Sequence, residues 1–442
     1  MNFPTLLVYS TYSMLFVMSL LLIVNKKKYQ TIGVFCLIML APFQITTLFD
    51  IGFGFSFFET SLLISSMTIF IRKLLVGKLE FVLNKWAKIF GIMLCAIFIT
   101  VIIAYFRRLF GDLEPLSGYK DNTILFRSFM GCGRLIFYTL SLLIIKKHIS
   151  VSGNLIWRSV LISSFLPIIA LLYQEFLHAV PLSLYANNST FSMDGVWLIF
   201  NGIPPKAFTQ ELTFFCFYTI FSIVAGFELY DNRRISASLF LGFLFLQIFG
   251  VLLAASRMGV LSMVIILFLY MRKQLSLIKS GIVIIGLGLL SVFISNIQQY
   301  VSGLAQYASN YERVTSLLQI ITQQNYSFDG SAFDRITSMI AAFNVFIQKG
   351  LLLGVGYFNL QFYSQRLESS TNHSFIIQLL AEFGLPLFII FCLIIYFISR
   401  KMISGEKKWL LNLSIYSLSG IPLHAPFTYL LILLPGNKVY DK

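Results

Sequence analysis

The stretch TNHSFIIQLLAEFGLPLFIIFCLIIYFISR, residues 371–400, joins a polar start to a hydrophobic run long enough to span a membrane. One ionisable residue, Glu382, interrupts the run. Thr371 or Asn372 can cap the first turn of a helix here, because the leading backbone N–H groups lack intrahelical partners. His373 then stands at the positive end of the helix dipole, which favours a neutral imidazole that can accept a proton. The stretch therefore predicts a proton acceptor where a membrane helix meets water.

The rest of the chain is also built from hydrophobic segments. Hydrophobic residues make up 57% of the 442 residues and charged residues only 12%, whereas soluble domains carry about 25% charged residues. The segments that could each cross a bilayer as a helix are 3–24, 31–49, 54–71, 87–106, 124–145, 156–177, 209–229, 235–255, 258–271, 280–296, 374–399 and 409–434. We predict an all-α polytopic membrane protein with 10 to 12 transmembrane helices. The five cysteines are isolated in apolar runs without metal-ligand spacing, so we interpret them as packing residues.

Positive charge is concentrated in alternate loops. Of the 33 Lys and Arg residues, 20 follow the odd-numbered spans, and the positive-inside rule places these loops in the cytoplasm. This distribution accounts for the net charge of +15 without a nucleic-acid partner. The opposite, outer face carries the longest polar segment, so the predicted organisation is a membrane bundle over 1–296, an extracytoplasmic loop over 297–372 and two final helices over 373–442.

Part of the long loop has the periodicity of an amphipathic helix. Large apolar residues recur there at helical spacing: Phe333, Ile336, Ile340, Phe343 and Ile347. Asp329 or Ser331 can cap the helix and Gly350 can end it. We predict a helix near 332–349 that lies on the bundle or in the membrane interface.

Two arginines on the outer face are candidates for binding phosphate. Arg257 interrupts LLAASRMGVL between two spans, and a guanidinium can hold phosphate oxygens in a bidentate fork. Alternatively, Arg257 extends its charged end to the membrane interface. Arg335 lies in the first turn of the predicted loop helix, where an arginine and a helix N-terminus together suit an anion. Alternatively, it pairs with Asp334 or Asp329 on a solvated face.

Charged residues elsewhere need partners inside a membrane. Arg127 and Arg134 are seven residues apart and lie on nearly one face of the fifth predicted span. Glu175 or Glu211 could be their partners, or both arginines face a polar cavity. Glu211, in KAFTQELTFF, is a candidate for binding an acceptor, or pairs with Lys206 or Arg127.

His373 has two interpretations from its position alone. It can act as a general base that takes a proton from an attacking hydroxyl, or it can serve as a hydrogen-bonding residue at the helix start. The sequence contains no Walker loop, dinucleotide fingerprint or HExxH motif, and no His/Cys/Asp cluster with metal-ligand spacing. We therefore expect no cofactor and no metal.

Three stretches, in order, resemble the O-antigen ligase and Wzy polymerase superfamily of bacterial surface-polysaccharide enzymes. They are LLAASRMGVLSMVI, FDRITSMIAAFNVFIQKGLLLGVGYFN and NHSFIIQLLAEFGLPLFII, and KAFTQELTFF is a weaker fourth. They are similar to the family's Ser-Arg turn, its arginine-led loop helix with P-L-L-G-x-G, and its H-N-x-x-L-x-x-L-x-E-x-G-L-x-G segment. Ser374 and Pro386 depart from the family pattern, as does the absence of a Glu-Pro pair after Gln210.

The resemblance implies a membrane glycosyltransferase of GT-C-like fold that uses a polyprenyl-diphosphate-linked glycan without metal or nucleotide. Arg257 and Arg335 would hold the donor diphosphate, and His373 would deprotonate the acceptor hydroxyl. The active site would face the periplasm or cell exterior from the bacterial inner membrane. Expected partners are the lipid bilayer and, from the same pathway, a chain-length regulator and a flippase.

Three activities fit these patterns to different degrees. We favour a polymerase that joins lipid-linked repeat units into O-antigen, capsular or exopolysaccharide. A ligase that moves finished polymer onto lipid A core or protein would share the donor chemistry. A lipid-oligosaccharide flippase is less consistent with the sequence, which shows no internal repeat and places its candidate charges at one face rather than at the midplane.

Overall fold

A computed structural model describes most of the chain as two compact units. The described residues are 3–42, 47–50, 54–76, 84–116, 119–149, 152–176, 212–253, 257–271, 330–368, 374–402, 404–417 and 426–434. One unit comprises residues 1–79, 148–326 and 438–442, and the other residues 80–147 and 327–437. Here they are called unit 1 and unit 2 and are treated separately.

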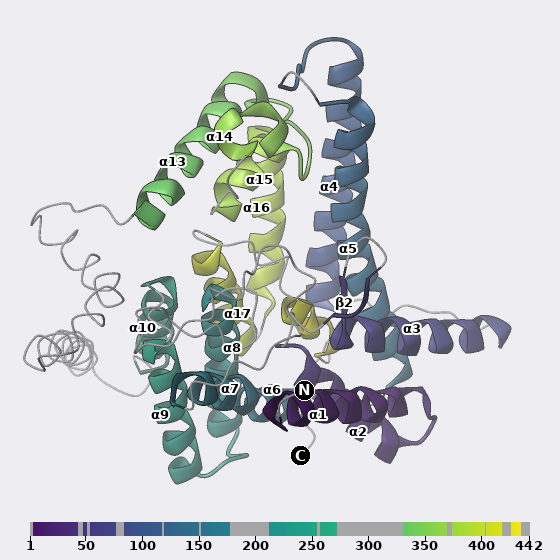
Figure 1. The fold of residues 1–442 in the computed structure, drawn as a ribbon, viewed down its shortest axis with the longest axis vertical. Helices are drawn as coiled ribbons and strands as arrows, with labels where there is room; N and C mark the ends of the chain where they lie inside the picture. The colour runs from purple at the N-terminus through teal and green to yellow at the C-terminus, as the bar shows by residue number, and fades with distance from the viewer. Residues whose placement is uncertain are drawn as a thin grey trace, which may run out of the picture. The chain divides into compact units, whose positions relative to one another are not determined.

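Unit 1 is helical in its described part apart from one short hairpin (Figure 1). Its elements are α1 Phe3–Ser19, the 3-10 turn η1 Leu20–Ile23, α2 Lys27–Leu40, β1 Thr47–Asp50, β2 Gly54–Ser56, α3 Phe57–Leu75, α6 Gly153–Ser163, α7 Phe165–Phe176, α8 Leu212–Asp231, α9 Ala237–Leu253 and α10 Arg257–Met271. Strands β1 and β2 pair antiparallel. Ser56 and Glu59 form a capping box at the start of α3, which satisfies amides that a helix start otherwise leaves free.

Helix α8 is the centre of unit 1, and α6, α9 and α10 pack against it. Its sequence is apolar on all sides, as expected of a helix surrounded by other helices. The Phe227 ring stacks on Tyr270 of α10 at 3.9 Å between centroids. The Tyr270 hydroxyl donates to Glu228 Oε1 at 3.3 Å, which gives this buried carboxylate a partner.

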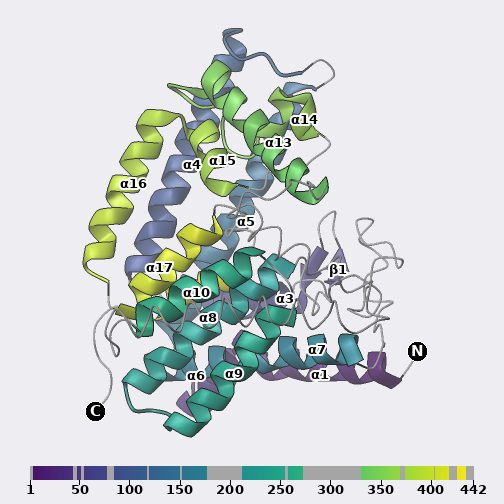
Figure 2. The ribbon, with the colours of Figure 1, turned by 90° about the vertical axis from the view of Figure 1, so that its left-hand side faces the viewer.

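Unit 2 contains two long helices and a C-terminal group of shorter ones (Figure 2). Its elements are α4 Lys85–Leu109, α5 Asp121–His148, α13 Gly330–Val345, the π-helical turn η5 Phe346–Gly350, the 3-10 turn η6 Leu360–Tyr363, α14 Gln365–Glu368, α15 Phe375–Phe383, α16 Leu385–Arg400, α17 Ser404–Tyr416 and the 3-10 segment η8 Pro426–Leu433. Helix α4 packs against both α15 and α16.

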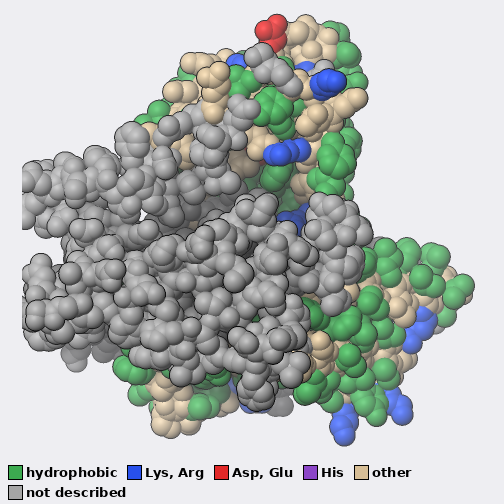
Figure 3. Space-filling view, in the orientation of Figure 1, with side chains coloured by type: hydrophobic (Ala, Val, Ile, Leu, Met, Phe, Trp, Pro, Cys, Tyr) green, Lys and Arg blue, Asp and Glu red, His purple; other side chains and the backbone are tan. Residues whose placement is uncertain are grey.

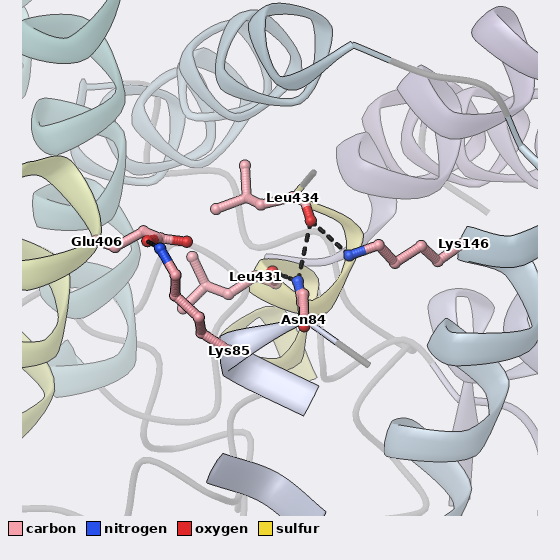
Figure 4. A network of polar contacts seen from close by, with 6 residues as sticks. All are labelled: Asn84, Lys85, Lys146, Glu406, Leu431 and Leu434. Atoms are coloured by element: carbon pink, nitrogen blue, oxygen red, sulfur yellow. Dashed lines mark hydrogen bonds and ion pairs between the residues drawn. The ribbon is translucent and has the colours of Figure 1, made fainter. Parts of the chain in front are cut away.

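A polar network fixes the end of η8 to the start of α4 (Figure 4). Asn84 caps α4 by accepting from the amide of Ala87 at 2.8 Å, and its Nδ2 donates to the carbonyl of Leu434 at 2.9 Å. Lys146 Nζ donates to the same carbonyl at 2.5 Å. Carbonyls that an α-helix would pair internally are thus satisfied by side chains of α4 and α5.

The helices have the composition of a membrane protein. Among the described residues, three helices are long and apolar enough to cross a bilayer: Lys85–Leu109, Asn122–His148 and Phe214–Asp231. Helix α16 is apolar, yet Phe391 is its only buried side chain. An exposed apolar surface of this length is costly in water and is expected against lipid. The prediction of an all-α membrane protein is confirmed at this level.

Prolines shorten one predicted span and divide another. The segment 31–49 is helical only to Leu40. Ala41 keeps helical dihedral angles as the C-cap, but Pro42 has no N–H and cannot continue the hydrogen-bond ladder. The segment 156–177 is divided into α6 and α7 at Ser164, three residues before Pro167, whose missing N–H cannot continue the hydrogen-bond ladder. Hydrophobicity was therefore a poor guide to helix ends where prolines occur.

The last two predicted spans are also interrupted. The segment 374–399 is two helices, because Gly384 adopts a φ of +75° between α15 and α16. The segment 409–434 contains α17, which ends at Tyr416, and the 3-10 segment η8, which begins at Pro426. The predicted span 280–296 and the proposed boundaries at 296 and 372 lie outside the residues that the structure describes.

Candidate functional site

Helix α13 confirms the helix predicted near 332–349. It runs from Gly330 to Val345, and a π-helical turn extends it to Gly350, the predicted stop. Because the helix begins before the predicted start, Arg335 lies in its second turn rather than its first. The dipole acts mainly within the first turn, so the helix N-terminus contributes less to an anion site at Arg335 than the sequence indicated. The Arg335 side chain is not among those described.

The two faces of α13 differ in an unexpected way. Ser338, Ala342 and Val345 are buried, whereas Ile340, Phe343 and Ile347 remain 54%, 44% and 52% exposed. The large apolar side chains therefore point away from the protein, and small side chains provide most of the packing. This exposure favours the membrane interface over the bundle surface as the surroundings of the stripe.

A glycine-rich segment after α13 packs against the end of α15. The amides of Val355 and Gly356 donate to the carbonyls of Ala381 and Glu382 at 3.0 and 3.1 Å. A Cβ on Gly354 would lie 2.2 Å from the Glu382 carbonyl oxygen, so only glycine fits there. The two motif segments GLLLGVG and LLAEFGL, distant in the sequence, thus form one backbone-to-backbone contact.

Glu382 adds a side-chain contact to the same interface. Its carboxylate is fully buried, and Oε1 accepts from the Phe358 amide at 2.9 Å and from Gln378 Nε2 at 3.0 Å. Sequence reasoning noted this residue as an interruption of a hydrophobic run and matched it to the Glu of the third family segment, but gave it no role. A lone carboxylate within such a run was the available signal, because intramembrane charges are retained where they have a role.

The start of α15 differs from the prediction in its cap. Ser374, with extended backbone, is the N-cap, and its side chain accepts from the Ile377 amide at 3.4 Å. The predicted cap at Thr371 or Asn372 was therefore wrong, and both residues lie outside the described part of the chain. The candidate base His373 immediately precedes the cap and lies outside the described residues, as does Glu211.

Four cations that sequence reasoning did not connect converge on residues 354–363 of unit 2. Arg107 Nη1 donates to the Gly354 carbonyl at 2.6 Å, while its Nε pairs with Asp112 at 2.7 Å. Arg108 donates to the Tyr363 hydroxyl at 3.4 Å. Several basic side chains are visible on this end of the unit, which holds α13 and α14 (Figure 3).

Arg127 and Lys349 complete this basic cluster through aromatic rings. The Arg127 guanidinium lies 5.8 Å from the Phe362 ring centroid, and Lys349 Nζ lies 5.4 Å from that of Tyr363. Arg127 therefore contacts a ring rather than a carboxylate in the described part of the chain. Arg134 is exposed on the same helix, α5. The side chains of their predicted partners Glu175 and Glu211 are not described.

Arg257 is the first residue of α10 and belongs to unit 1. Its side chain is not described, so its meeting with Arg335 and His373 stays a prediction.

Comparison with protein families tests the resemblance. Residues 242–392 match the family model described as O-antigen ligase. Over these residues the chain is similar to the O-antigen ligase family. No curated protein matches the chain. The O-antigen ligase match covers about a third of the sequence, includes α10, α13 and α15, and encloses Arg257, Arg335 and His373. This match confirms the resemblance to the superfamily over this part of the chain.

Proposed function

We propose that this protein is a glycosyltransferase that polymerises polyprenyl-diphosphate-linked oligosaccharide repeat units. The observation that carries the proposal is the O-antigen ligase match, which encloses the two candidate phosphate-binding arginines and the candidate base. The backbone hydrogen bonds between the segment after α13 and the end of α15, called the backbone interlock below, support the proposal. They join the helix of Arg335 to the helix that begins beside His373.

In the proposed reaction, an acceptor hydroxyl attacks the anomeric carbon of the donor glycan. The new glycosidic C–O bond forms as the bond from that carbon to the diphosphate breaks, with inversion. His373 takes the hydroxyl proton, and the polyprenyl diphosphate leaves with the electron pair. Arg257 and Arg335 offset the charge that develops on the leaving diphosphate. Arg127, which is exposed, and Lys349, which is partly exposed, give unit 2 positive charge suited to an anionic donor, whereas Arg108 is buried and Arg107 pairs with Asp112.

The proposal includes the surroundings of the reaction. The chain would have twelve spans in a GT-C-like arrangement in the inner membrane, with the active site on the periplasmic or exterior face. It would need neither metal nor nucleotide. Glu211, Arg127 and Arg134 would contact donor or acceptor, and a flippase and a chain-length regulator would act beside it.

A ligase is the second candidate, favoured by the description of the matching family. It would transfer completed polymer from the same carrier to lipid A core or protein. The donor step is common to both, so the products distinguish them.

The test supplies lipid-linked repeat units to membranes containing wild type or His373→Ala at matched abundance. Gel electrophoresis then reports glycan length. His148→Ala is the control. His148 is the last residue of α5, falls within unit 1, and contacts Gln30 and Arg72 rather than the candidate site. We expect the His373 variant to leave single repeat units and the control to make long polymer.

Other outcomes identify the alternatives. Long polymer that stays on its carrier in the His373 variant would indicate a ligase. Unchanged polymer on the final acceptor would exclude His373 as an essential base and would favour a transporter.

A further inference from the structure

The proposed reaction leaves Glu382 without a role, although it is a fully buried carboxylate. Burying a carboxylate is unfavourable unless donors surround it. Its donors include the side chain of Gln378 and the backbone amides of Phe358 and Leu360. Gln378 lies on the same helix, so the two backbone amides connect Glu382 to another part of the chain.

Phe358 occupies a strained position. Its φ is +66°, a left-handed conformation that is unfavourable for a bulky side chain and persists only where surrounding contacts enforce it. The Glu382 carboxylate bonds the Phe358 amide from one side. From another side, the Ser128 hydroxyl of α5 contacts the Tyr357 carbonyl at 3.0 Å and Asn359 Oδ1 at 2.8 Å. This segment, residues 354–359, is called the Phe358 turn below.

The Phe358 turn connects the two helices of the candidate site. It follows α13 and η5, which carry Arg335, and it is bonded to the last turn of α15. The other end of α15 begins one residue after Ser374, next to His373. At 1.5 Å per helical residue, Ser374 and Glu382 are about 12 Å apart along the helix, so a shift at Glu382 is carried to the helix start by a rigid element.

We propose that Glu382 is a positioning residue for glycosyl transfer. Its carboxylate holds the Phe358 turn on α15 and thereby fixes α13, the helix of Arg335, relative to α15, which begins two residues after His373. This inference rests on the proposed function. Misplacement of reacting groups by about 1 Å can reduce turnover about a hundredfold.

The experiment compares Glu382→Ala, Glu382→Gln and Ser128→Ala by kcat and by KM for the lipid-linked donor. We expect Glu382→Ala to lower kcat by about tenfold or more while KM changes by less than about threefold. Glu382→Gln should restore most of kcat, because its amide oxygen still accepts from Phe358. Ser128→Ala should lower kcat in the same direction, because it releases the same turn from the other side.

Glu228→Ala is the matched control. Glu228 is also buried and hydrogen-bonded but lies on α8 of unit 1. We expect it to lower thermal stability and membrane abundance while kcat per molecule stays near that of wild type.

The inference is overturned if Glu382→Ala keeps wild-type kcat, or if Glu382→Gln is as impaired as Glu382→Ala. If Glu382→Ala does not accumulate, Glu382→Gln and Ser128→Ala decide, and normal kcat in Ser128→Ala overturns it. His373→Ala separates the two proposals, because an active His373 variant contradicts the proposed function whatever Glu382 does. An inactive His373 variant beside a fully active Glu382→Ala contradicts only the positioning role.

Discussion

Gly354 shows at the scale of one residue why the motif after α13 contains glycine. Its φ is +67°, and its Cα faces the Glu382 carbonyl so closely that no side-chain atom fits. Gly384, which follows α15 on the other side of this contact, has a φ of +75°. A Cβ on Gly384 would lie 2.6 Å from the Leu352 carbonyl oxygen. Both glycines are required by conformation and by space.

We predict that Gly354→Ala destabilises the protein. A left-handed non-glycine residue costs about 1–2 kcal/mol and overpacking about 1–3 kcal/mol, so we expect a loss of roughly 2–5 kcal/mol. Thermal unfolding in detergent measures it, with Gly91→Ala as control, because a Cβ on Gly91 meets nothing within 4 Å. Equal stability of the two variants would contradict the packing described here.

The sequence predicted the local structure around single residues better than their contacts in the folded protein. It placed Arg335 on a helix and predicted that another helix begins near Ser374, because capping residues and apolar spacing depend only on nearby positions in the chain. It could not connect Arg107 with Gly354 or Arg127 with Phe362, since these contacts join segments more than 200 residues apart. Those pairings depend on tertiary packing that no local pattern encodes.

At the scale of elements, α13 is the clearest case of a correct prediction with an unexpected orientation. Its period was evident, but periodicity does not say whether an apolar stripe meets protein or lipid. The small buried residues Ser338 and Ala342 bring the helix close to its neighbours, and the stripe is left outside.

We predict that this stripe lies in the membrane interface. Spin labels at Ile340→Cys and Ile347→Cys, in a background without the native cysteines, should be more accessible to oxygen than to a water-soluble nickel chelate. A label at the exposed polar position Gln348, beside the edge of the stripe, should show the reverse preference. High chelate accessibility at every position would place the stripe in water.

At the scale of the whole molecule, composition was sufficient for the class but not for the details. A charged fraction of 12% and long apolar runs predicted a helical membrane protein. They did not reveal where Pro42, Pro167 and Gly384 divide those runs, because hydropathy averages over many residues and a single backbone conformation does not change it.

We predict that the exposed cysteines of α4 and α16 face lipid. Cys95 and Cys392 are exposed, yet they should resist a membrane-impermeant maleimide added to either side of the membrane and react after denaturation. Glu114→Cys should label only from outside and Lys401→Cys only from the cytoplasm. Labelling of Cys95 in intact membranes, or of Lys401→Cys from outside, would contradict the orientation.

The backbone interlock also bears on how the chain is made. The amides of Val355 and Gly356 leave the ribosome before the carbonyls of Ala381 and Glu382 that accept their hydrogen bonds. Arg107 of α4 and Ser128 of α5, which bond the carbonyls of Gly354 and Tyr357 in the same turn, are synthesised more than 200 residues earlier. The turn can therefore close only when α15 has been translated. A nascent chain halted before that point would hold every earlier helix and still lack an assembled site.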